Sequence, residues 1–142
     1  MNKVNTMQDC IFCDIYKNHK DLFLFEDNVC FIILDKYPTS KGHSLVITKN
    51  HYENMLETPD SDIEHCFRIA KHFGLHISDM LGTKHLNVAT NIGRFAKQVV
   101  MHFHIHIIPR YNEKIKYVYW KDREISSEDE NKMRELLKVK KL

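Results

Sequence analysis

The stretch from His102 to Ile107 constrains the fold more than any other part of the sequence, because polar and apolar residues alternate along it. Successive side chains of a β-strand point to opposite faces, so one face carries three histidines and the other carries Phe103, Ile105 and Ile107. The apolar face must pack on the core, but no packing requirement places three imidazoles in a row. Two functional interpretations are open at this point: a three-histidine metal site, or histidine used as nucleophile and proton-transfer group.

Short apolar runs elsewhere predict the partners of this strand. The predicted strands cover residues 22–26, 29–34, 43–48, 86–90 and 99–108. The turn-forming residues Asp27 and Asn28 join the first two strands as a hairpin. Pro109 is expected to end the last strand, because proline has no amide hydrogen to donate to a neighbouring strand.

Two helices are predicted from apolar spacing and from residues that cap helix ends. Apolar residues three and four apart predict a long helix over about 61–80, opened by a capping box of Ser61 and Glu64. A second capping box, Ser127 and Glu130, opens a short C-terminal helix. The order of these elements predicts an α+β fold, a mostly antiparallel five-stranded sheet with the helices packed on one face.

Composition and charge limit the class of protein. At 142 residues, with 43% hydrophobic and 28% charged residues, the chain matches one soluble globular domain. Its net charge is +2 with the two signs interleaved, so no surface for nucleic acid is predicted. No apolar run reaches the roughly 18 to 20 residues that cross a bilayer, and residues 1–6 lack the apolar part of a signal peptide. We therefore expect a cytoplasmic protein with no membrane partner.

One of the two cysteine pairs suggests chemistry. Cys30 lies in an apolar run and Cys66 lies on the apolar face of the predicted long helix, so both are interpreted as core residues. The two-residue gap between Cys10 and Cys13 allows both thiolates to reach one Zn²⁺ at about 2.3 Å, although such a pair is half a site. Two free thiols are the alternative.

The sequence resembles the histidine triad (HIT) superfamily, in which His-x-His-x-His is followed by apolar residues, as it is here from His102 to Pro109. Other features fall in the family's order, namely Cys10-Ile11-Phe12-Cys13, the Glu26-Asp27 turn, Asp35, the 42–47 strand with His51 after it, and Asn91. The resemblance is to the Hint-like branch in its bacterial, zinc-binding form. It divides the chain into a flexible N-terminus (1–9), a HIT domain (10–111) and an extension with a short helix (112–142), in which Tyr117, Tyr119 and Trp120 are interpreted as packing residues.

The resemblance implies a homodimer in which His104 attacks the α-phosphorus of a purine nucleoside phosphoramidate, acyl-adenylate or dinucleoside polyphosphate. A nucleotidyl-histidine would form, and water would then release the nucleoside monophosphate. Neutral imidazole suits this step, because its ordinary pKa of about 6.5 leaves it unprotonated near pH 7. His106 would donate to a non-bridging oxygen of the phosphate, and His43 would complete the catalytic cluster.

The same resemblance assigns binding and metal residues. Asp35 corresponds to the family's ribose-binding acid, with a plain turn former as the alternative. The positions that border the base or phosphate are Phe12, Ile15, Ile33, Asn91, Gln98 and Val99. Phe12, Ile15 and Ile33 are equally interpretable as core residues. His51 and His102 would join Cys10 and Cys13 in a closed Cys₂His₂ site, whose Zn²⁺ would be structural.

Two positions depart from the family pattern. Lys97 stands where many relatives have glycine, so it is expected either to slow catalysis or to favour polyphosphate substrates by its charge. Val99 stands where eukaryotic Hint proteins have a serine that contacts the leaving group. These departures keep two alternatives open: a nucleotide-binding regulatory protein with weak turnover, and a zinc hydrolase that binds its ion through the three triad histidines.

Overall fold

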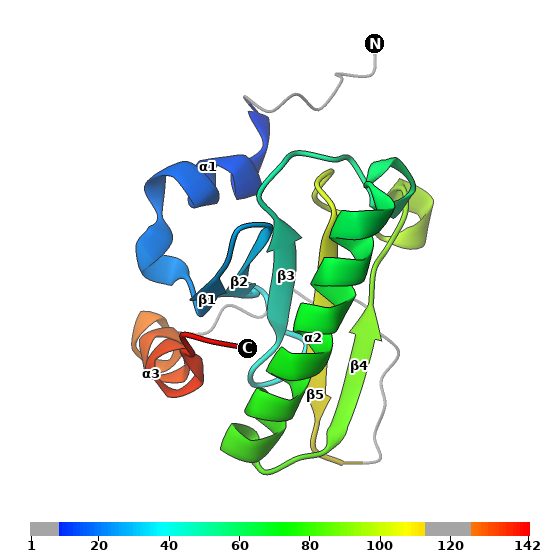
Figure 1. Cartoon of the computed structure of the whole chain (residues 1–142). Helices are drawn as coiled ribbons and strands as arrows, with labels where there is room; N and C mark the ends of the chain where they lie inside the picture. Colours follow the sequence, from blue (N-terminus) through cyan, green and yellow to red (C-terminus); the bar gives the residue numbers. More distant parts are fainter. Residues whose placement is uncertain (1–8, 113–125) are drawn as a thin grey trace.

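The computed structural model describes residues 9–112 and 126–142, which contain a five-stranded antiparallel sheet of order β1-β2-β3-β5-β4 (Figure 1). The strands are β1 (Phe25–Glu26), β2 (Cys30–Leu34), β3 (Ser44–Thr48), β4 (His85–Ala89) and β5 (His104–Arg110). The α+β class and the five-stranded antiparallel sheet predicted from the sequence are confirmed. β5 lies between β3 and β4, so His106 is paired on both backbone edges, whereas His104 is paired with β3.

Helices cover both faces of this sheet (Figure 1). α2 (Asp60–Leu81) packs one face, where Phe73 and Ile77 join Phe103, Ile105 and Ile107 in one buried cluster. α1 (Ile11–Asn18) covers the other face and buries Phe12 against Phe31, Ile33, Leu45 and Ile47 of β2 and β3. The prediction that helices occupy one face alone is therefore wrong, because α1 was not foreseen.

α3 (Ser127–Leu137) docks beside β1 at the end of the sheet (Figure 1). Leu137 is buried in the cluster under α2, and His76 of α2 donates through Nε2 to the Leu137 carbonyl at 2.9 Å. The amide of Val139 donates to the Leu24 carbonyl at 3.0 Å. Backbone bonds and core packing thus hold the C-terminal segment against the domain.

Several predicted element ends are wrong for identifiable reasons. β1 is two residues long because residues 20–22 form a 3-10 turn, and further 3-10 turns cover Met55–Glu57 and Arg94–Ala96. β5 begins at His104 and not at 99, since the amide of Phe103 already donates to the Tyr52 carbonyl in a loop. It also continues through Pro109, which is tolerated because the pairing with β3 ends at Ile107.

Both predicted capping boxes are wrong by one residue or more. α2 begins at Asp60 after Pro59, with no side-chain cap, and the acidic first turn interacts favourably with the positive end of the helix dipole. α3 is capped by Ser126, whose hydroxyl accepts from the amide of Asp129. The helix over 61–80 is otherwise confirmed and ends at Leu81, followed by Gly82, whose φ of 70° is left-handed.

The expectations for residues 1–8 and for Tyr117, Tyr119 and Trp120 lie outside the described residues. Among the helices that are described, none combines the length and apolar character needed to span a bilayer.

Candidate active site and metal centre

The triad histidines lie on the face of the sheet that α1 covers, as the alternation predicts. Phe12 of α1 packs edge-on against the rings of His102 and His104, at centroid distances of 5.9 and 5.1 Å. The rings of His104 and His106 lie 4.9 Å apart. All three histidines are buried, with 0 to 6% of their surface exposed. The strand therefore presents two adjacent imidazoles at the site, and the third, His102, lies two residues before its first residue.

One hydrogen bond fixes which nitrogen of His104 can act as a nucleophile. The Nδ1 atom lies 2.6 Å from the carbonyl oxygen of His102, which can only accept, so Nδ1 carries the hydrogen. The lone pair is therefore on Nε2. Burial lowers the pKa of His104 and outweighs the raising effect of this hydrogen bond, so the imidazole is neutral near pH 7.

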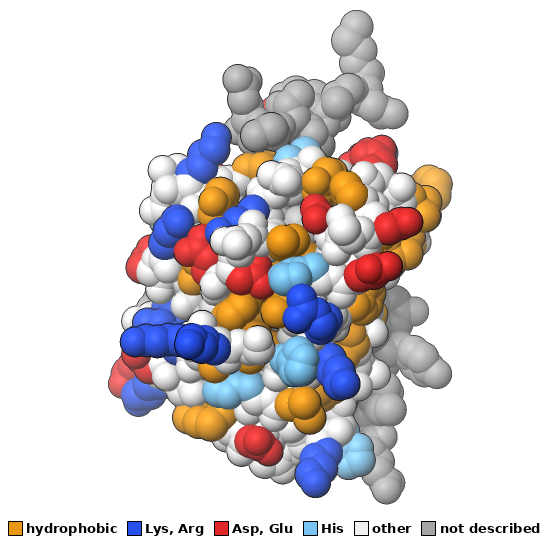
Figure 2. Space-filling view, viewed as in Figure 1, with side chains coloured by type: hydrophobic (Ala, Val, Ile, Leu, Met, Phe, Trp, Pro, Cys, Tyr) orange, Lys and Arg blue, Asp and Glu red, His pale blue; other side chains and the backbone are white. Residues whose placement is uncertain are grey.

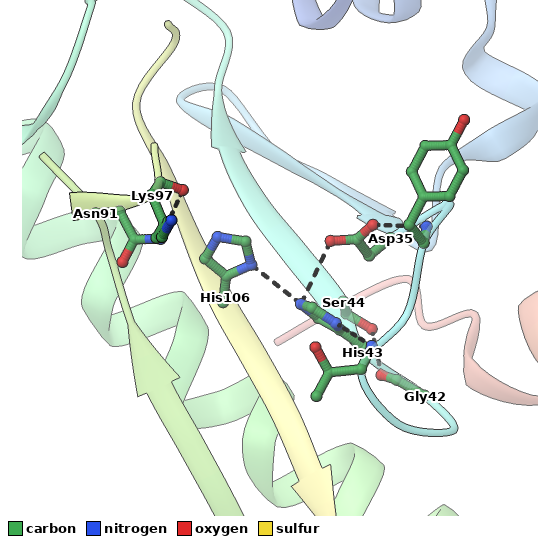
Figure 3. A network of polar contacts seen from close by, with 9 residues as sticks. Asp35, Gly42, His43, Ser44, Asn91, Lys97 and His106 are labelled. Carbon is green, nitrogen blue, oxygen red and sulfur yellow. Dashed lines mark hydrogen bonds and ion pairs between the residues drawn. The ribbon is translucent and has the colours of Figure 1, made fainter. Parts of the chain in front are cut away.

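A chain of hydrogen bonds fixes the proton of His106 in the same way (Figure 3). The amide of Thr39 donates to Nδ1 of His43 at 3.0 Å, so the hydrogen of His43 is on Nε2. That Nε2 lies 3.0 Å from Nδ1 of His106, which must accept, and the proton of His106 is therefore on Nε2. Burial lowers the pKa of His43 to about 3 and that of His106 to about 2, so both are neutral donors.

Asp35 completes this network from the end of β2 (Figure 3). One carboxylate oxygen accepts from the amide of Tyr37 at 2.8 Å, and the other lies 3.4 Å from Nε2 of His43. Because His43 is neutral and its Nε2 hydrogen is directed to His106, the second contact is a close approach and not an ion pair. Burial raises the pKa of Asp35 to about 6, so the carboxylate is ionised near neutral pH and can accept from a hydroxyl group.

A pocket of about 480 Å³ opens onto these groups. Its walls include His104, His106 and Asp35, together with the side chains expected near a base or leaving group, Phe12, Ile15, Ile33 and Val99. The sequence missed further wall residues, notably Tyr37 after β2 and Glu130 and Arg134 of α3. No local pattern indicates that α3 would dock here, because its position is set by long-range packing.

Three predicted site residues, His43, Gln98 and Asn91, are not among the residues that line this pocket. His43 contacts His106 through the hydrogen bond described above. Gln98 is buried and its amide bonds to the backbone of Gly93, Glu53 and Val100, so it fixes the loop that precedes the triad. Asn91 donates to the carbonyl of Lys97 at 3.3 Å in the same loop (Figure 3). Contact of Gln98 or Asn91 with a substrate stays a prediction.

Lys97 lines the pocket from a left-handed backbone conformation, with φ 68° and ψ 26°. A side chain costs about 1–2 kcal/mol there, which explains why a glycine suits this position. We expect Lys97→Gly to raise the free energy of unfolding by about 0.5–1 kcal/mol, after the entropy of glycine in the unfolded chain is subtracted. Urea unfolding of Lys97→Gly beside Lys97→Ala measures this, since the alanine variant loses the charge but keeps the strain. Equal stability of the two variants would contradict it.

His102 belongs to a second cluster, which consists of two cysteines and two histidines. Cys10 directly precedes α1 and Cys13 is in its first turn, His51 follows β3, and His102 precedes β5. The Nε2 of His102 donates to the Thr48 carbonyl at 2.7 Å, which turns Nδ1 toward the cluster. That Nδ1 lies 3.3 Å from Sγ of Cys10, 3.6 Å from Sγ of Cys13 and 3.1 Å from Nδ1 of His51.

These distances are close to those of four ligands around one tetrahedral ion. With metal bonds of about 2.0–2.1 Å to nitrogen and about 2.3 Å to sulfur, tetrahedral neighbours lie about 3.3–3.8 Å apart. The two distances from Nδ1 of His102 to sulfur fall within this range, and the 3.1 Å between the two imidazole nitrogens is slightly shorter. Burial, together with the neighbouring Cys10, raises the pKa of the Cys13 thiol to about 12, an effect that a bound cation counters. The four predicted metal residues are thus brought together in a geometry compatible with zinc.

Residues 16–113 match the HIT domain model. The chain belongs to the HIT family. It is 42% identical to adenylylsulfatase HINT3 of Arabidopsis thaliana over 75% of its own length and 55% of that protein. It therefore spans little more than half of this relative. It is 38% identical to adenosine 5'-monophosphoramidase hnt1 of Schizosaccharomyces pombe over 84% of the chain and 89% of the relative.

A solved HIT structure with zinc is also similar. The crystal structure of a Zn-bound histidine triad family protein from Mycobacterium smegmatis superposes with a TM-score of 0.76 at 27% identity, covering 93% of this chain and 95% of that one.

Proposed function

We propose that this HIT protein is a nucleotide hydrolase or transferase that forms a nucleotidyl-histidine on His104 and releases a nucleoside monophosphate. The observation that supports this most is the fixed tautomer of His104, whose Nε2 lone pair lies at the pocket while the His102 carbonyl holds Nδ1. Nε2 attacks the α-phosphorus and the bond to the leaving group breaks. The ring becomes cationic, and the His102 carbonyl, 2.6 Å away, stabilises that charge.

Neighbouring groups of the pocket support the other parts of this step. His106 holds its proton on Nε2 and can donate to a non-bridging oxygen, where negative charge must be stabilised. Asp35 is ionised near pH 7 and can accept from ribose hydroxyls. Apolar side chains of Phe12, Ile15 and Ile33 form walls suited to a purine. In the second step water attacks phosphorus, the bond between phosphorus and Nε2 breaks, and one proton of the water is released to solvent, which returns neutral His104.

The relatives favour adenosine 5'-phosphate derivatives as substrates, because they are named for adenylyl sulfate and adenosine phosphoramidate. We expect the chain to release AMP from adenosine phosphoramidate, lysyl-adenylate or diadenosine tetraphosphate, or from more than one of them. Chromatography of reaction mixtures measures the release. Binding of nucleotide without release from any of the three would support the alternative of a regulatory protein with weak turnover.

The zinc-hydrolase alternative is less compatible with the positions of the histidines. His102 turns Nδ1 to the cysteines, whereas His106 groups with Asp35 and His43. We propose instead that Cys10, Cys13, His51 and His102 bind one structural Zn²⁺. Four protein ligands leave no open coordination position, so the ion would join α1 to the segments before β5 and after β3. This assignment corresponds to the bacterial, zinc-binding form of the Hint-like branch.

We also propose a homodimer formed through the α2 face and the β4 edge. Phe67, Leu75 and Met80 of α2 are exposed, as is Val88 of β4, whose outer backbone edge is the end of the sheet. Figure 2 shows apolar side chains between charged ones on the face that carries α2. Light scattering at micromolar concentration should give about twice the chain mass of 17.0 kDa. A single-chain mass would contradict the dimer. The cytoplasmic location stays a prediction.

A further inference from the structure

The sheet order places Lys97 across the catalytic histidines from Asp35. Asp35 follows β2, which lies beyond β3, whereas Lys97 belongs to the loop between β4 and β5, on the opposite side of β5. Figure 3 shows Lys97 and Asp35 on opposite sides of His106. Both residues line the pocket that opens onto His104. Under the proposed function, a nucleotide with its ribose at Asp35 and its phosphorus at His104 therefore extends its leaving group toward Lys97.

The charge of Lys97 is available to a ligand. Lys97 is exposed, and Val99 and Val100 of the same loop line the pocket beside it with apolar side chains. Other lysines form ion pairs within residues 9–112 and 126–142, but Lys97 forms none there; the paired residues are Lys20, Lys49, Lys132 and Lys138. An anion at this side of the pocket would therefore meet an ammonium group that has no competing carboxylate in the described part of the chain.

The backbone at Lys97 gives a second indication that its side chain has a role. The φ of 68° is left-handed, and among the described residues no other residue except glycine has a positive φ. Glycine adopts this conformation at little cost, whereas a residue with a side chain is strained there. Strained residues of this kind gather at functional sites, where the surrounding structure holds them in place. A long cation at a strained position in the wall of the pocket is consistent with a role in binding.

The first chemical step divides leaving groups into two classes. As Nε2 of His104 bonds to phosphorus, the bond to the leaving group breaks and its electron pair goes to the leaving atom. A sulfate or a polyphosphate departs as an anion, whose charge an ammonium group stabilises. An amine must instead gain a proton as it leaves, which the side chains of Val99 and Val100 cannot donate.

We propose that Lys97 binds the leaving group and selects substrates that release an anion, a sulfate or a polyphosphate, over those that release an amine. This inference rests on the proposed function for the position of the nucleotide. It makes Lys97 a specificity-determining residue of the same pocket, and it names the class of substrate that the pocket takes.

Turnover of three adenosine substrates tests the inference. Lys97→Gln should lower kcat/KM for adenylyl sulfate, for diadenosine tetraphosphate or for both by about 10-fold or more, the effect of one charge-assisted contact. Release of AMP from adenosine phosphoramidate should change by less than about 3-fold, because its leaving group is ammonia and carries no negative charge. Lys97→Arg keeps the charge and should keep most of the wild-type preference. The substrate that shows the loss identifies the anion as sulfate or polyphosphate.

A matched control is available in the same loop. Arg94 is an exposed cation that does not line the pocket, so Arg94→Gln changes the net charge equally and should keep the wild-type selectivity. Circular dichroism checks that each variant is folded. An equal effect of Lys97→Gln on all three substrates, or turnover of all three at wild-type rates, would overturn the proposal.

Binding to a variant without the nucleophile separates this inference from the proposed function. In the His104→Ala background, calorimetry should show ADP bound about 10-fold more tightly than AMP, because the β-phosphate takes the place of the leaving group. Adding Lys97→Gln should reduce this ratio to about 3-fold or less. A ratio that does not depend on Lys97 would overturn the inference even if turnover is normal. A ratio that depends on Lys97, without turnover of any substrate by the wild type, would reject the proposed function and leave the anion site intact.

Discussion

Replacing His104 by alanine is expected to lower kcat for release of nucleoside monophosphate by at least about 10⁴-fold, because the variant has no nucleophile for the first step. Nucleotide binding should survive, since Asp35 and the apolar walls of the pocket are unchanged. His106→Ala should have a smaller effect, about 10²- to 10³-fold, since it removes one donor to the phosphate and leaves the nucleophile in place.

The measurement is a single-turnover assay with nucleotide affinity determined in parallel. His19→Ala is a suitable control, because His19 is half exposed at the end of α1 and outside the pocket. Wild-type protein quenched in alkaline denaturant, in which a phosphorus–histidine bond survives, should carry a covalent nucleotide that His104→Ala lacks. Wild-type turnover in a folded His104→Ala variant would refute the proposed mechanism.

The face of the sheet that carries the site could be predicted because strand geometry leaves no alternative. A side-chain period of two places His104 and His106 opposite Ile105, and the apolar face is the one that packs on the core under α2. The spacing of Cys10 and Cys13 indicated half of a metal site, and family resemblance added His51, His102 and Asp35. The structure brings the four metal residues within reach of one ion. The tautomers of the histidines could not be predicted from the sequence, because they depend on the carbonyls of His102 and Thr48 and on the amide of Thr39.

The parts that could not be predicted depend on short elements and distant contacts. α1 has eight residues, too few for apolar spacing to distinguish a helix from a loop, although Ile11, Phe12 and Ile15 do fit one helix face. α3 was predicted as a helix, but its place over the pocket depends on Leu137 and Val139, which contact residues far away in sequence. Local sequence patterns do not predict such long-range packing. Glu130 was therefore assigned to a helix cap and not to the pocket.

The zinc assignment predicts opposite behaviour of two single variants. The wild type should contain about one zinc per chain, and Cys13→Ala should lose it, because three remaining ligands cannot close the tetrahedral site. We expect this variant to lose about 3 kcal/mol of stability, which lowers Tm by about 10 °C in a chain of this length. His104→Ala should keep its metal, because Nδ1 of His104 bonds to a carbonyl and does not face the cysteines.

Elemental analysis and thermal unfolding of both variants test this assignment directly. Cys66→Ala is the matched control, since Cys66 of α2 is also buried but lies in the hydrophobic core and not in the metal cluster. It should keep zinc even if packing costs it some stability. If the ion is structural, a chelator should inactivate the protein only as α1 detaches from the sheet and the domain partly unfolds. Activity should therefore fall at the same rate as the structure changes. Metal lost from His104→Ala but kept in Cys13→Ala would instead place the ion on the triad and overturn both the zinc site and the nucleophilic role of His104.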